Sequence, residues 1–228
     1  MNSIAVIFTG YIVLLLAIPY AHAFFQQTSK VVDNSFVSGT FVLPSVTPTI
    51  SVYTPQAGDI VINEINWGGS RLSTSDEWLE LRNMRDTEID IGGWTIENLG
   101  GSSSASATIA IPQGKAIAAK GYFLIANAAM TSSKINVSPD VITTAISLLD
   151  TGEELRLRST GGVVLDIANR TGAWFKGSKT PVYKSMERKE PPANGTDTVN
   201  WQDASTHAGM DASGSTDEYG TPNNPNGI

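Results

Sequence analysis

The motif with the clearest chemical precedent is the Asp-Thr-Gly at residues 150–152, which directly follows two leucines. Aspartic proteases present a carboxylate in this way, and they need two carboxylates close enough to share a proton. The chain has no second Asp-Ser/Thr-Gly, and Glu153 and Glu154 stand where the protease motif continues with a small residue. We therefore predict a surface hairpin turn, in which Gly152 supplies a positive φ and Asp150 bonds turn amides.

Two acidic groupings carry the oxygen ligands that Ca²⁺ prefers. The candidate calcium ligands are Glu64, Asp76, Glu77, Asp211 and Asp217. An EF-hand loop has glycine at its sixth position, whereas Gly214 is fourth in the loop that begins at Asp211. The alternative interpretations are salt bridges to Arg82 and Arg71 and a solvated Ser/Gly loop. We predict no metal and no other cofactor, and keep calcium as the alternative.

The five tryptophans are candidates for a sugar-stacking platform. Trp78 and Trp94 stand among aliphatic strand residues, which favours a place in the core. Trp67 and Trp174 flank glycine-containing loops, and they are the candidate ligand-binding aromatics. Trp201 is expected to anchor the C-terminal segment.

The residues that most catalytic sites require are scarce. The chain has two histidines and no cysteine. His22 falls in a predicted signal segment and His207 in a polar loop, so a Ser-His-Asp or Cys-His arrangement and a histidine-rich zinc site are not expected. We predict a protein without catalytic residues; a hydrolase with a carboxylate site is the alternative.

Charge and hydropathy point to a chain outside the cytoplasmic membrane. The 15 basic and 22 acidic residues give a net charge of −7, which argues against nucleic acid as a partner. The first 29 residues carry no charged side chain, and Ala-His-Ala at 21–23 fits a signal-peptidase site. We predict a cleaved signal peptide at 1–23, with an uncleaved membrane anchor as the alternative. A Ser/Thr/Pro-rich linker is predicted at 24–57.

From residue 58 onward the pattern becomes that of short strands. Residues 78–82, 94–97 and 155–158 alternate apolar and polar side chains, and residues 122–126 form a continuous apolar run. Clusters of Gly, Pro, Asn and Asp separate these runs. Such spacing predicts an all-β sandwich or barrel. A helical turn or two is expected at most at 127–134.

Several of these strands, in order, resemble the lamin tail domain family. The matching stretches are WLELRN at 78–83, GWTI at 93–96, IPQGKAI at 111–117, KGYFLI at 120–125 and TGEEL at 151–155. INEI at 62–65, SMER at 185–188 and GTPN at 220–223 resemble its prokaryotic branch. The resemblance spans 58–226. It implies an immunoglobulin-like β-sandwich with an extended C-terminal segment, and it implies no shared catalytic residues.

The predicted function is therefore a non-catalytic module for protein interaction or assembly at the cell surface. An accessory or substrate-binding module of a secreted hydrolase and a calcium-binding surface domain are the alternatives. The partner is expected to be a protein of the cell envelope, and membrane contact is expected only through an uncleaved N-terminal segment. The C-terminal segment from 171 is expected to be ordered by Tyr183, Met186 and Trp201, with Lys184, Arg188 and Lys189 facing acidic strands that bear Glu64, Glu77 and Glu80.

Overall fold

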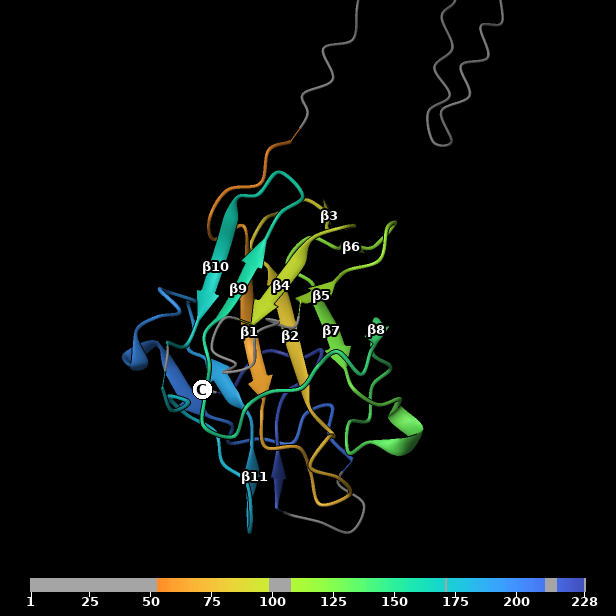
Figure 1. Cartoon of the computed structure of the whole chain (residues 1–228), viewed down its shortest axis with the longest axis vertical. Helices are drawn as coiled ribbons and strands as arrows, with labels where there is room; N and C mark the ends of the chain where they lie inside the picture. The colour runs from red at the N-terminus through yellow and green to blue at the C-terminus, as the bar shows by residue number, and fades with distance from the viewer. Residues whose placement is uncertain (1–52, 99–107, 171, 212–216, 228) are drawn as a thin grey trace, which may run out of the picture. The chain divides into compact units, whose positions relative to one another are not determined.

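Alternating side chains build two β-sheets that share one apolar core. The computed structural model describes residues 53–98, 108–170, 172–211 and 217–227 (Figure 1). The predicted signal segment 1–23 and nearly all of the predicted linker 24–57 lie outside these residues. Within the described part of the chain there is no α-helix, only two 3-10 turns, η1 (Met130–Ser132) and η2 (Thr198–Asn200). The prediction of an all-β fold is confirmed.

The larger sheet has six strands in the order β13-β12-β1-β2-β7-β8. Its members are β13 (Trp201–Asp203), β12 (Met186–Arg188), β1 (Ile60–Asn66), β2 (Trp78–Asn83), β7 (Tyr122–Ala126) and β8 (Val141–Ile142). The pairs are antiparallel except β7–β8, which is parallel. Strands from both ends of the domain therefore lie side by side at β1 and β12.

The second sheet has four antiparallel strands in the order β10-β9-β4-β5. They are β10 (Val164–Ala168), β9 (Leu155–Arg158), β4 (Thr95–Asn98) and β5 (Thr108–Ala110). Two short pairs complete the fold: β3 (Ile89–Asp90) with β6 (Ala116–Ile117), and β11 (Tyr183–Lys184) with β14 (Glu218–Tyr219). The immunoglobulin-like sandwich is thus built mostly from antiparallel pairs (Figure 1).

The inner faces of both sheets contribute to a single buried cluster. Leu79 and Leu81 of β2 are fully buried there, as are Ile96 of β4 and Leu157 of β9. Leu79 and Leu81 are two residues apart on β2, because successive side chains of a strand point to opposite faces of the sheet. The period-2 pattern therefore predicted the core-facing sides of β2 and β9 correctly.

A second apolar cluster lies on the outer face of the large sheet. It consists of Trp78, Leu124, Ala126, Ile135 and Met210. The first three occupy the outward positions of β2 and β7, alternating with the core residues. Backbone bonds from Asn136 N to Gly209 O (2.7 Å) and from Asp211 N to Lys134 O (2.7 Å) join the covering segments. The outer face is therefore covered by a third layer, to which the C-terminal segment belongs.

The C-terminal segment packs on the sandwich where the structure describes it, but Arg188 and Lys184 do not face the acidic strands as expected. Met186 and Trp201 are fully buried in the core. Arg188 is also fully buried, where it pairs with Asp166 of β10 and lies 4.7 Å from the centre of the Trp201 ring. Because Arg188 follows Glu187 on the strand, the two side chains point to opposite faces, and Arg188 enters the space between the sheets. Lys184 instead lies 4.9 Å from the centre of the Tyr219 ring.

The predicted turn at 150–152 is present, but the predicted strand before it is absent. Gly152 has φ of +89°, and its amide donates to Leu149 O at 2.9 Å. Residues 147–149 are not a strand, because both edges of β9 are occupied by β4 and β10. Their backbone is satisfied by carboxylates instead, with Leu148 N donating to Glu77 and Leu149 N to Glu153.

Candidate functional site

Three glutamates form a row across adjacent strands on the outer face of the large sheet. Glu64 of β1 pairs in register with Glu187 of β12 on one side and with Glu80 of β2 on the other. A register shift between Ile62 and Glu64 brings the two β1–β2 glutamates opposite one another. All three side chains are fully buried. We call these residues the carboxylate row.

Residues 218–227 cover the carboxylate row, and we call them the strap. One strap amide donates to each carboxylate: Thr221 N to Glu64 Oε1 (2.9 Å), Asn223 N to Glu80 Oε2 (2.5 Å) and Gly227 N to Glu187 Oε2 (3.0 Å). These bonds provide donors that water would otherwise supply.

Two asparagines fill the gap between the strap and the sheet. The side-chain amide of Asn226 donates to Asn63 O (3.2 Å) and to Arg188 O (2.6 Å). In return, Nδ2 of Asn63 donates to Asn226 Oδ1 (2.8 Å) and to Glu80 Oε1 (2.8 Å). The strap is therefore held by backbone amides and neutral side chains rather than by cations.

Burial dominates the electrostatics of the carboxylate row. It raises the pKa of Glu64 to about 8, with the neighbouring charge of Glu187 adding to the effect. Burial likewise raises the pKa of Glu80 well above its ordinary value, with Glu64 as the next cause, and it raises the pKa of Glu187. Three carboxylates withdrawn from water, with like charges beside them, favour protonation of the row near neutral pH.

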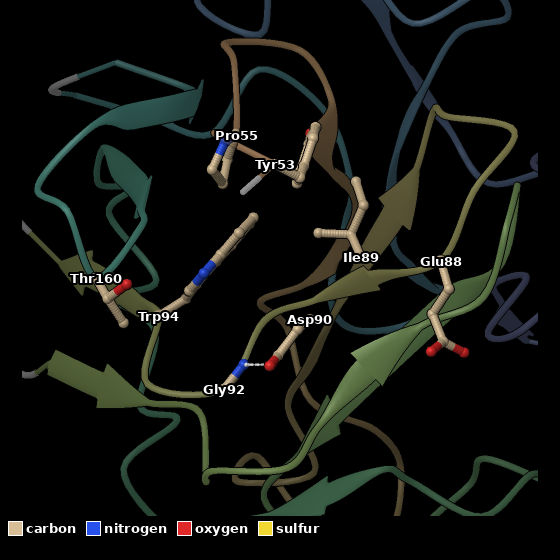
Figure 2. Close-up of a pocket in the computed structure, with 8 residues that line it drawn as sticks. All are labelled: Tyr53, Pro55, Glu88, Ile89, Asp90, Gly92, Trp94 and Thr160. Atoms are coloured by element: carbon tan, nitrogen blue, oxygen red, sulfur yellow. Dashed lines mark hydrogen bonds between the residues drawn. The ribbon is translucent and has the colours of Figure 1, made fainter. Parts of the chain in front are cut away.

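A hollow of about 300 Å³ opens elsewhere on the surface (Figure 2). It is lined by Tyr53, Pro55, Glu88, Ile89, Asp90, Gly92, Trp94 and Thr160. Figure 2 shows the Trp94 ring directed toward Pro55, with Thr160 on one side and Ile89 on the other, whereas the Glu88 carboxylate points away. The hollow therefore has an aromatic floor and a mixed polar and apolar wall.

Local bonds hold the wall of this hollow in place. The Tyr53 hydroxyl donates to Asp59, and the Arg85 guanidinium lies 5.6 Å from the centre of the Tyr53 ring. At the opposite wall Gly92 N donates to Asp90 Oδ1 at 2.8 Å. The indole of Trp94 is only 3% exposed, so a ligand here would meet its edge rather than its face.

The candidate calcium ligands are distributed over separate places. Glu64 lies in the carboxylate row, Asp217 pairs with Arg71, and Glu77 accepts from Leu148 N at 3.0 Å. Asp76 accepts from Lys134 N (2.8 Å), and Asp211 lies 3.5 Å from the ammonium of the same lysine. The described part of the chain contains no cluster of three or more His, Cys, Asp or Glu that could hold a metal ion. The segment 212–216, which includes Gly214, lies outside it.

The two candidate ligand-binding tryptophans contact each other. The rings of Trp67 and Trp174 are stacked, with centroids 6.2 Å apart and planes inclined by 9°. Their indole N–H groups donate inward, to Lys176 O (2.9 Å) and Leu149 O (2.7 Å) respectively. Trp174 belongs to the core cluster and Trp67 packs against it. Ring stacking and the two internal hydrogen bonds are enough to account for the positions of Trp67 and Trp174.

Two other predicted surface groups have identifiable partners. Asp150 was predicted to be a turn residue. Its side chain is exposed and forms an ion pair with Lys179. His207 was expected to be a solvated loop residue, but its ring lies against Tyr219 with centroids 4.2 Å apart, and its Nδ1 lies 2.5 Å from Glu218 O. His207 is thus half-buried beneath the start of the strap.

Sequence reasoning missed Glu187 and the polar residues of the strap. Glu187 was part of the SMER stretch that carried the family resemblance, and Thr221 was part of GTPN. Strand alternation placed Glu80 on the outer face. No local signal paired β12 with β1, because Glu187 stands more than a hundred residues from Glu64.

A family model described as Lamin Tail Domain matches residues 54–172, which include β1 to β10 and end before the strap. A search of curated proteins gives no match. In the part of the chain that the structure describes, no helix has the length and hydropathy needed to cross a membrane.

Proposed function

The chain belongs to the lamin tail domain family, and from this premise we propose that it is a non-catalytic module that binds a protein partner at the cell surface. The observation that carries the proposal is the hollow beside Trp94, which is open to solvent and is lined by Tyr53, whose hydroxyl donates to Asp59. Its size suits one or two side chains of a partner, and its mixed lining resembles a small recognition pocket more than an enclosed substrate cavity.

The carboxylate row supports a non-catalytic function. Two facing carboxylates are the minimum for a carboxylate hydrolase, and the row has three. Yet each of them accepts a strap amide, so a substrate would have to displace residues 218–227 to reach them. We therefore assign the three glutamates of the carboxylate row a structural role, which is to bind the strap.

Location outside the cytoplasmic membrane is part of the proposal. It rests on the uncharged N-terminal stretch and the Ala-His-Ala site at 21–23. The net charge of −7 is in keeping with a partner other than nucleic acid or an anionic lipid surface. The partner is expected to be a protein of the same envelope.

An affinity capture with a filled hollow tests this function. The full chain is used to capture proteins from envelope extracts of its source cells, beside Thr160→Arg, which places a long side chain at the hollow. Val199→Arg is the matched control, because Val199 is 66% exposed and does not line the hollow. We expect one set of captured proteins with the wild type and the control, and its loss with Thr160→Arg at an unchanged melting temperature. Equal capture by all three chains would contradict a function of the hollow.

A further inference from the structure

We propose that the strap, residues 218–227, is a pH-operated latch that undocks from the large sheet in alkaline solution. The proposal concerns a conformational change and is independent of the function of the hollow. It starts from the way the strap is attached: three backbone amides and one hydroxyl reach three carboxylates that lie side by side.

The geometry at Thr221 favours a proton on the row. The hydroxyl oxygen of Thr221 lies 2.8 Å from Glu64 Oε2, 3.1 Å from Glu187 Oε1 and 3.3 Å from Asn226 Oδ1. A threonine hydroxyl has one hydrogen and can donate to one of these oxygens at a time. A proton on the carboxyl group of Glu64 or Glu187 would supply the hydrogen for the second contact. With both carboxylates ionised, one short oxygen–oxygen contact would lack its hydrogen.

Neutral donors such as the Ser185 hydroxyl, together with Arg82, offset only part of the cost of negative charge in the row. The titratable or charged groups that face Glu64 from the packed strands are Glu187 on β12, Glu80 and Arg82 on β2, Tyr122 on β7, and Glu190, which pairs with Arg82. Opposite Glu187 on β13 stands the neutral Gln202. The strap carries one charged side chain, Glu218 at its start, and none from Tyr219 to Gly227. Lys184 and His207 both lie against the ring of Tyr219.

The direction of the pH effect follows from linkage. In the docked state burial raises the pKa of Glu64 to about 8, whereas an undocked row is exposed to water and ionises near 4.5. Docking therefore takes up protons: it is fully favoured below about pH 4.5 and is lost as the pH rises through about 8. If only the ionisation of Glu64 is counted, the equilibrium constant for docking of the strap falls by roughly a hundredfold between pH 6 and pH 9.

Amide hydrogen exchange, corrected for the intrinsic pH dependence of exchange, measures the latch directly. The probes are the amides of Thr221, Asn223 and Gly227, each bonded to a different carboxylate. We expect their protection factors to fall at least tenfold from pH 6 to pH 9, while amides of the β2–β7 ladder keep theirs. Unchanged strap protection, or an equal loss throughout β2, would overturn the proposal.

Two amide substitutions supply the matched comparison. Glu64→Gln removes one of the three ionisable groups and keeps its size, so the fall of strap protection between pH 6 and pH 9 should be smaller than in the wild type. Glu97→Gln is the control: Glu97 is half-buried on β4 of the other sheet, where it pairs with Arg158, and this variant should keep the wild-type response. A Glu64→Gln chain with an unaltered pH response would count against the latch.

A measurement on the wild type remains decisive if Glu64→Gln does not fold. The side-chain carboxyl resonance of Glu64 is followed by carbon NMR through a pH titration of the full chain. We expect its midpoint above pH 7, together with loss of the docked strap signals over the same range. A midpoint below pH 6 would refute a proton held by the row.

Discussion

Replacing Trp201 by alanine should remove a large part of the stability of the domain. The indole is fully buried, its N–H donates to Gly195 O at 2.8 Å, and Arg188 lies over its ring. Truncation of a buried tryptophan costs about 3–5 kcal/mol. The orphaned Gly195 carbonyl adds about 1 kcal/mol, and loss of the ring beneath Arg188 adds a similar amount. We expect a total of about 5–7 kcal/mol, a third or more of the stability of a typical domain.

Urea denaturation followed by circular dichroism measures this loss. Trp201→Phe keeps most of the apolar contact and removes the donor, so it should cost about 1–2 kcal/mol. Val199→Ala is the control, because that side chain is largely exposed and lies two residues away; its change should stay within about 0.5 kcal/mol. A loss below about 1 kcal/mol for Trp201→Ala would refute the view that the C-terminal segment is part of the core.

Three further outcomes are expected. Asp150→Asn, at an exposed side chain, should cost about 1 kcal/mol or less in urea denaturation, whereas Gly152→Val should cost several times more because φ is +89°; an acid peptidase activity lost in Asp150→Asn would contradict the turn role. Burial raises the pKa of Glu77 from 4.5 to about 7, so its contribution to stability is complete below 4.5 and is lost as the pH rises through about 7; Glu77→Gln should flatten part of the fall in melting temperature from pH 5 to pH 8, and parallel curves would exclude this. N-terminal sequencing of the protein isolated from its source cells should begin at Phe24 if the predicted signal peptide is cleaved, and a retained initiating methionine on membrane-bound protein would favour the anchor.

Local patterns were enough to predict the strands and their inward faces. Apolar and polar side chains alternate along residues 78–83 and 155–158, a pattern typical of a half-buried strand. Both stretches are strands in the structure. The helical turn expected within 127–134 is η1. These strands and turns are determined by residues close together in the sequence, so they can be predicted from a single sequence.

Long-range partners were beyond such reasoning. Residues 147–149 look like a strand, but tertiary structure gave both edges of β9 to other strands. Arg188 was expected to face the acidic strands, but its position in the β12 alternation turned it inward to Asp166. The C-terminal segment was expected to meet the strands of Glu64 and Glu80 through basic side chains, but nothing local indicates that backbone amides of residues 218–227 reach these carboxylates instead.

The attachment of the strap has a consequence for the order of folding. Thr221 and Glu64 are 157 positions apart in the sequence. During synthesis β1 and β2 can pair early, but their outward glutamates stay hydrated until the strap has been made. Such non-local closure predicts slow folding for a domain of this size, because the entropy of closing the loop is lost before the contact forms. A chain interrupted before residue 218 would expose the carboxylate row beside the second apolar cluster, which contains Trp78. This acidic surface would distinguish incomplete chains from complete ones.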